Sequence, residues 1–115
     1  MITEDMVPLL EMVRAARTEL VDDTGDSADR CARLLRVAEA YASDLPRRVV
    51  DDAGALRTVT AVRTELGTCL IAVDRLTDAG VADTIVTDVL RRGTTLAERV
   101  LTVAAFGPET VGATP

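Results

Sequence analysis

The sequence predicts an all-α protein, an antiparallel four-helix bundle in which the third and fourth helices form a long hairpin. Three observations lead to this prediction. Apolar residues recur at intervals of three and four over long windows, as they do along one face of an α-helix. Residues that typically end or begin helices separate these windows. A chain of 115 residues, 48% of them hydrophobic, fits one domain with a buried core.

The first helix is expected from about residue 2 to residue 20. Thr3 is a suitable N-cap, and Pro8 is tolerated because it lies near the first turn. The segment DDTGDSAD at 22–29 ends this helix, and Asp26 or Ser27 caps the next one. The apolar seam of the first helix consists of Ile2, Met6, Leu9, Val13, Ala16 and Leu20.

The second helix is expected to end at Pro46, which also biases Leu45 away from helical backbone angles. Residues 46–52 then connect to the third helix, either as a plain connection or with a short helical turn. The apolar seam of the second helix consists of Cys31, Leu34, Ala38, Tyr41 and Leu45.

The third helix is expected from about Asp52 to Asp78, and Gly80 follows as a residue with positive φ. Its seam consists of Ala53, Leu56, Val59, Val62, Leu66, Cys69, Val73 and Leu76. The alternation in TVTAV at 58–62 also fits a strand, but the longer helical spacing argues against one.

The fourth helix is expected to begin at Asp83 or Thr84. Its seam consists of Ala82, Ile85, Val89, Gly93, Leu96, Val100 and Val103. Residues 1–106 are predicted to be a single helical-bundle domain. The segment GPETVGATP at 107–115, rich in Pro and Gly, is predicted to be a flexible C-terminal tail.

The third and fourth helices have apolar faces that are wider than a simple seam. The additional residues, which form a candidate interface, are Leu70, Ile71, Val86, Leu90, Ala97 and Leu101. A four-helix monomer accommodates this excess if the two helices lie at its centre. Otherwise the excess forms a dimer interface, because large exposed apolar patches are rare on soluble monomers.

Two glycines in the hairpin suggest a close approach. Gly67 and Gly93 each lie thirteen residues from Gly80, so a tight antiparallel turn places them at similar heights on facing helices. Arg63 lies near the seam of the third helix, where an arginine either pairs with a carboxylate, extends to solvent or binds an anion. A candidate ligand pocket therefore contains Arg63, Gly67 and Gly93.

Cys31 and Cys69 lie at equal distances from the connection between the second and third helices, so their sulfurs could share one level. Free buried thiols are the favoured interpretation, with a disulfide or a reactive thiol as alternatives. The spacing is not that of a zinc site. The acidic segment 22–29 also lacks the EF-hand pattern, because Arg33 stands at its twelfth loop position.

The composition narrows the function classes. The chain has no His and no Lys, so imidazole bases and Schiff-base lysines are excluded. The net charge of −6 argues against nucleic-acid binding, and no apolar run approaches the length of a membrane span. The acidic N-terminus is unlike a signal peptide, so we expect a cytoplasmic protein.

We expect Asp29–Arg33 and Asp88–Arg92 to pair on solvated faces, or such arginines to meet an acidic partner helix.

These observations predict a non-enzymatic helical-bundle module for protein–protein interaction, which forms a homodimer or homo-oligomer or binds a helical partner. The alternative is a small anionic-ligand-binding protein, or a small Arg-dependent enzyme, with a pocket between helices. A filled core with an apolar outer patch favours the first function. A pocket with convergent arginines and carboxylates favours the second. We predict no catalytic residues, no cofactor and no metal.

Overall fold

Four long helices make up the described part of the protein, as the sequence predicts. The structure, a computed structural model, describes residues 4–21 and 25–106, and these contain no strand. The helices are α1 (Val7–Glu19), α2 (Ser27–Asp44), α3 (Ala53–Asp78) and α4 (Asp83–Phe106). Short 3-10 turns, η1 (Glu4–Met6) and η2 (Leu45–Arg47), precede α1 and follow α2. The strand alternative for 58–62 is wrong, because this segment lies within α3.

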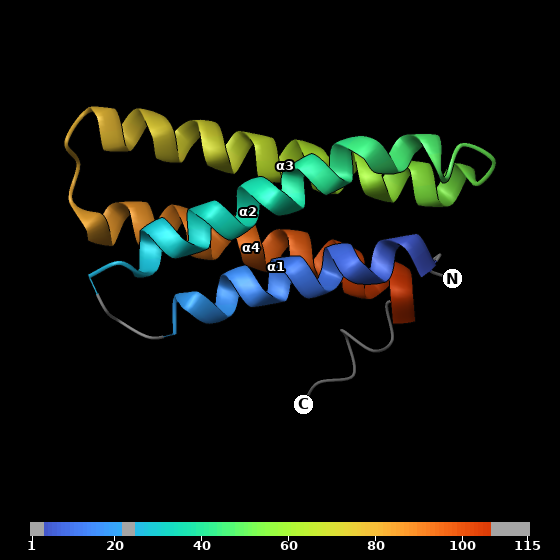
Figure 1. The fold of residues 1–115 in the computed structure, drawn as a ribbon, viewed down its shortest axis with the longest axis horizontal. Helices are drawn as coiled ribbons and strands as arrows, with labels where there is room; N and C mark the ends of the chain where they lie inside the picture. The colour runs from blue at the N-terminus through green and yellow to red at the C-terminus, as the bar shows by residue number, and fades with distance from the viewer. Residues whose placement is uncertain (1–3, 22–24, 107–115) are drawn as a thin grey trace.

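The helices alternate in direction and form an antiparallel bundle (Figure 1). Each helix packs against its neighbour in sequence, and α1 also packs against α4, which closes the bundle. Helices α2 and α4 touch across the centre. The turn between α3 and α4 lies at the same end of the bundle as the last residues of α1 and the first residues of α2.

The core is aliphatic and receives side chains from all four helices. Leu9, Leu35, Leu66 and Leu90 are each fully buried, one from each helix. Burial of a leucine side chain stabilises the folded state by about 2 kcal/mol, so these layers dominate the stability of the bundle.

The first α-helix begins later than the sequence predicts. Residues 4–6 form a 3-10 turn, and α1 starts at Val7 with Pro8 in its first turn. Proline has no backbone N–H to donate, so it is accommodated only where a helix begins. The predicted cap, Thr3, lies outside the described residues. The hydroxyl of Tyr41 donates to the carbonyl of Asp5 (2.6 Å) and attaches this start to α2.

Two details at the ends of α2 differ from the prediction. Asp26 occupies the N-cap position, but its side chain makes no capping hydrogen bond. Leu45 has helical backbone angles (φ −61°, ψ −34°), although proline follows it. The missing N–H of Pro46 ends the α-helix, and the chain continues as a 3-10 turn instead of becoming extended. The side chain of Leu45 is fully buried, and this burial favours the helical backbone angles.

The ends of α3 agree with the prediction. The Asp52 carboxylate accepts a hydrogen bond from the N–H of Ala55 (3.0 Å). At the other end, Gly80 has φ +71°. The N–H of Gly80 donates to the carbonyl of Thr77, and the N–H of Val81 donates to that of Leu76, both at 3.0 Å. This Schellman motif turns the chain sharply into α4 and closes the predicted hairpin.

Candidate functional site

Helix α4 has two apolar faces with different surroundings. The inner face lies in the core and consists of Val86, Leu90, Ala97 and Leu101, together with Thr94. The other face, here called the outer stripe, consists of Ile85, Val89, Leu96, Val100 and Val103. Ile85 is 50% exposed and Leu96 44%, and the three valines are partly buried. The spacing of three, four and seven places all five on one side of the helix.

The structure does not place the two faces of α4 as the sequence suggests, with one as the core seam and the other as the candidate interface. Five of the six candidate interface residues are buried in the core of the monomer: Leu70, Val86, Leu90, Ala97 and Leu101. Only Ile71 is exposed, at 56%. The monomer therefore accommodates that face, because α1 and α2 cover it, and it is not an exposed interface. The seam expected in the core is only partly there. Gly93 is buried, and Val89 and Val100 pack against the core, whereas Ile85 and Leu96 are exposed.

The contact between Gly93 and Cys69 explains how α4 is rotated about its own axis, with the inner face in the core and the outer stripe at the surface. A Cβ atom on Gly93 would lie 2.5 Å from the Cys69 Sγ and 2.9 Å from its Cβ, so no side chain fits there. The Cys69 thiol also donates to the carbonyl of Val89 (3.7 Å). The backbones of α3 and α4 therefore approach closely at this level, which keeps Gly93 against α3.

Thr94 is the core residue of α4 that the apolar pattern does not reveal. It is fully buried, and its hydroxyl donates to the carbonyl of Leu90 (2.8 Å) within the same helix. This bond satisfies the hydroxyl without a partner from another helix. A buried threonine on a helix is therefore compatible with an apolar core, although hydropathy alone marks it as polar.

The predicted pocket residues do not come together. Gly67 faces α2, because the nearest atom to a Cβ built on it is Glu39 Oε2, at 4.0 Å. Its predicted approach to Gly93 is therefore wrong, and the close contact of Gly93 is with Cys69. Arg63 is exposed on the surface of α3.

Partly buried side chains of α3 border the outer stripe. Because Cys69 contacts α4, residues one or two turns away on the same side of α3 also lie beside α4: Glu65, Ala72 and Leu76. These three are partly buried. The outer stripe and this edge of α3 therefore form a shallow, mainly apolar surface along the hairpin.

Charged residues flank the outer stripe on its other side. Asp88 pairs with Arg91 (3.3 Å), so the predicted Asp88–Arg92 pair is replaced by one three residues apart. Arg92 and Arg99 are exposed, and the described part of the chain gives neither an ion pair. The predicted Asp29–Arg33 pair is confirmed at 2.6 Å.

The remaining faces of the bundle carry ion pairs between helices. Arg14 and Arg17 of α1 both pair with Glu98 of α4, the former at 3.0 Å. Arg36 of α2 pairs with Asp74 of α3 at 2.6 Å. Arg30 pairs with Glu19 at 2.6 Å. These arginines therefore have carboxylate partners within the chain, unlike Arg92 and Arg99 in the described residues.

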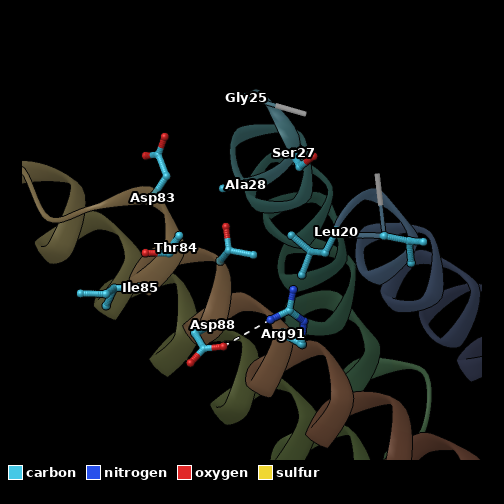
Figure 2. Close-up of a pocket in the computed structure, with 11 residues that line it drawn as sticks. Leu20, Gly25, Ser27, Ala28, Asp83, Thr84, Ile85, Asp88 and Arg91 are labelled. Carbon is cyan, nitrogen blue, oxygen red and sulfur yellow. Dashed lines mark hydrogen bonds and ion pairs between the residues drawn. The ribbon is translucent and has the colours of Figure 1, made fainter. Parts of the chain in front are cut away.

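A hollow of about 790 Å³ opens at the end of the bundle where α1, α2 and α4 meet (Figure 2). Arg91 is the one cationic residue that lines it, and Arg91 is paired with Asp88. Asp83 and Asp88 make the hollow acidic, and none of Arg63, Gly67 and Gly93 lines it. Its chemistry does not favour an anionic ligand.

The two cysteines are free, buried thiols, as the sequence favours, and the disulfide alternative is wrong. Burial raises the pKa of Cys31 to about 12, with smaller contributions from negative charge on Cys69 and Glu19. Burial raises the pKa of Cys69 to about 11, and Glu65 adds to the shift. Both thiols are protonated near neutral pH, whereas a nucleophilic cysteine needs its thiolate.

No group of three or more Cys, Asp or Glu residues that could hold a metal ion occurs within the ranges 4–21 and 25–106. The acidic segment 22–29 lies partly outside them. In the same ranges, none of the helices is long and apolar enough to span a membrane. The chain matches no protein-family model, no curated protein and no solved structure.

Proposed function

We propose that this chain is a non-enzymatic protein–protein interaction module that associates through the outer stripe of α4. The observation that carries the proposal is the exposure of Ile85 and Leu96 at 50% and 44%, on the side of α4 that also carries the partly buried Val89, Val100 and Val103. Exposed apolar residues that gather on one side of an element mark interaction sites more often than scattered single residues do.

The occupant of this surface is a second copy of the chain or a helix of another protein. A helix that lies along the outer stripe would contact α4 and the bordering side chains of α3 together. Recognition between a helix and an apolar groove uses anchors spaced by three, four and seven residues, and Ile85, Val89, Leu96 and Val100 are spaced by four, seven and four.

The raised thiol pKa values and the missing His and Lys support a non-enzymatic function. The alternative of an anionic-ligand site at Arg63, Gly67 and Gly93 has less support, because these residues lie apart. A cytoplasmic location remains part of the proposal.

Light scattering after size-exclusion chromatography tests self-association over a concentration series under reducing conditions. We expect a mass above that of the monomer, 12.2 kDa, which falls to the monomer value on dilution. Leu96→Glu places a charge in the outer stripe and should yield a monomer. Ile71→Glu is the matched control, since Ile71 is equally apolar and 56% exposed but lies on another face of the hairpin.

A wild-type protein that remains monomeric at every concentration contradicts self-association. Equal effects of the two glutamate variants contradict the assignment of the interface to the outer stripe.

A further inference from the structure

We infer that the occupant of the outer stripe is the outer stripe of a second copy, with the two α4 helices antiparallel. This inference rests on the proposed function, and it adds the identity and the orientation of the partner. It follows from two properties of α4: the spacing of the apolar residues and the positions of the charges beside them.

The apolar spacing fits an antiparallel pair. If a two-fold axis passes beside Gly93 and Thr94, Ile85 lies between Val100 and Val103 of the second copy. In the same arrangement, Val89 lies between Leu96 and Val100 of that copy. Each side chain then enters a gap between two others, which is how helices pack in coiled coils.

The charges select the same orientation. In this arrangement Asp88 lies opposite Arg99 of the second copy, and symmetry repeats the pair. Both residues belong to the exposed edge of the outer stripe that faces away from α3, so they meet on one side of the helix pair. Arg99 has no ion pair in the described part of the chain, and Asp88 has only its exposed contact with Arg91.

A parallel pair does not form these ion pairs. Its two-fold axis runs along the helices, so the edges that carry Asp88 and Arg99 lie on opposite sides of the helix pair. Ion pairs at facing positions specify register and orientation in helix pairs.

Three charge-reversal variants test the orientation: Asp88→Arg, Arg99→Asp and the double variant. Sedimentation equilibrium gives the dissociation constant of each. Each single variant places two like charges face to face, so we expect the dissociation constant to rise about tenfold. The double variant restores opposite charges, and its dissociation constant should return close to that of the wild type.

Arg63→Asp is the control, because it makes the same change in net charge as Arg99→Asp on an exposed residue of α3 outside the outer stripe. It should leave the dissociation constant unchanged. Thermal melts followed by circular dichroism verify that every variant is folded.

The outcomes separate this inference from the proposed function. A wild-type monomer at all concentrations overturns both. A dimer that Leu96→Glu disrupts, but that neither single charge reversal weakens, overturns the antiparallel orientation and leaves the interface in place.

Cysteine cross-linking provides a second measurement that does not depend on charge. Chains with Ile85→Cys are mixed with chains with Val103→Cys, and copper–phenanthroline with oxygen is the oxidant. In the antiparallel pair the two positions meet, whereas two copies of position 85 lie about 25 Å apart along the helix axis. A mixed disulfide is expected, and efficient linking of Ile85→Cys chains to one another overturns the inference. The native thiols are buried and do not compete.

Discussion

The inner face and the outer stripe of α4 contain the same kinds of side chain in different environments. Leu90 and Leu101 of the inner face are fully buried, whereas Leu96 and Ile85 of the outer stripe are about half exposed. Residue type therefore identifies both faces of α4 as apolar. The inner face is the core only because other helices cover it. The comparison implies that the inner face determines stability and leaves the outer stripe accessible for the association proposed above.

Truncation of one leucine on each face gives the largest expected difference. Leu90→Ala removes a fully buried side chain and should lower the free energy of unfolding by about 2–5 kcal/mol. Leu96→Ala should lower it by less than about 1 kcal/mol, because that side chain is already 44% exposed. Urea denaturation at concentrations where both variants are monomeric measures the difference. Equal losses would contradict the assignment of the two faces.

Alkaline pH tests the burial of Cys69 and Cys31 between the helices. Their pKa values in the folded protein are raised to about 11 and 12 from an ordinary value of 9.0. The unfolded chain therefore loses these protons first, so stability is complete below pH 9 and falls as the pH rises toward 11 and 12. At pH 10 each thiol should account for a loss of about 1.4 kcal/mol relative to pH 8.

Denaturation curves at pH 8 and pH 10 measure this loss. The variant with Cys31→Ala and Cys69→Ala is the control, because it retains every other titrating group and should lose less stability over this range. An identical pH dependence of the variant and the wild type would show that the thiols do not contribute.

Substitutions at two glycines compare a position of tight contact between helices with an open position. Gly93→Leu should destabilise the protein by about 1–3 kcal/mol, since its side chain would overlap Cys69. Gly67→Ala should instead stabilise it by about 0.5–1 kcal/mol, because its nearest neighbour is 4.0 Å away and alanine is the better helix former. Melting temperatures measure both effects. A higher melting temperature for Gly93→Leu would contradict the close approach of α3 and α4.

The smallest expected effect concerns ion pairs between α1 and α4, which hold the flank opposite the outer stripe. Glu98→Gln removes two pairs, with Arg14 and Arg17, and should cost up to about 1 kcal/mol. Asp29→Asn removes one fully solvated pair and should cost about 0.3–0.5 kcal/mol. Denaturation in low salt measures both costs, and 1 M NaCl should reduce both, because salt screens ion pairs. A cost for Asp29→Asn that equals the cost for Glu98→Gln would show that the second arginine adds nothing.

Local sequence signals account for most of the fold. The periodic apolar positions predict four helices, and the bounds of α3 are within one residue of the prediction because Asp52 and Gly80 act locally. The remaining boundary differences occur where a tertiary contact competes with local preference. Leu45 is the example, since its burial keeps it helical before a proline.

The candidate site was less predictable. The sequence identifies α4 as a helix with an unusually wide apolar face, and it identifies Gly93 as a position of close approach. It does not identify the partner of Gly93, because equal spacing from a turn specifies height along a helix but not rotation about its axis. Gly67 and Cys69 lie at similar heights, and only the rotation of α3 places Cys69 toward α4.

The sequence by itself determined the helical class, the hairpin and the amount of apolar surface, because these depend on residue type and on spacing along the chain. The tertiary structure decided which apolar face of α4 became the core. That choice depends on how four helices pack together, and on the one level at which Gly93 allows α3 and α4 to approach.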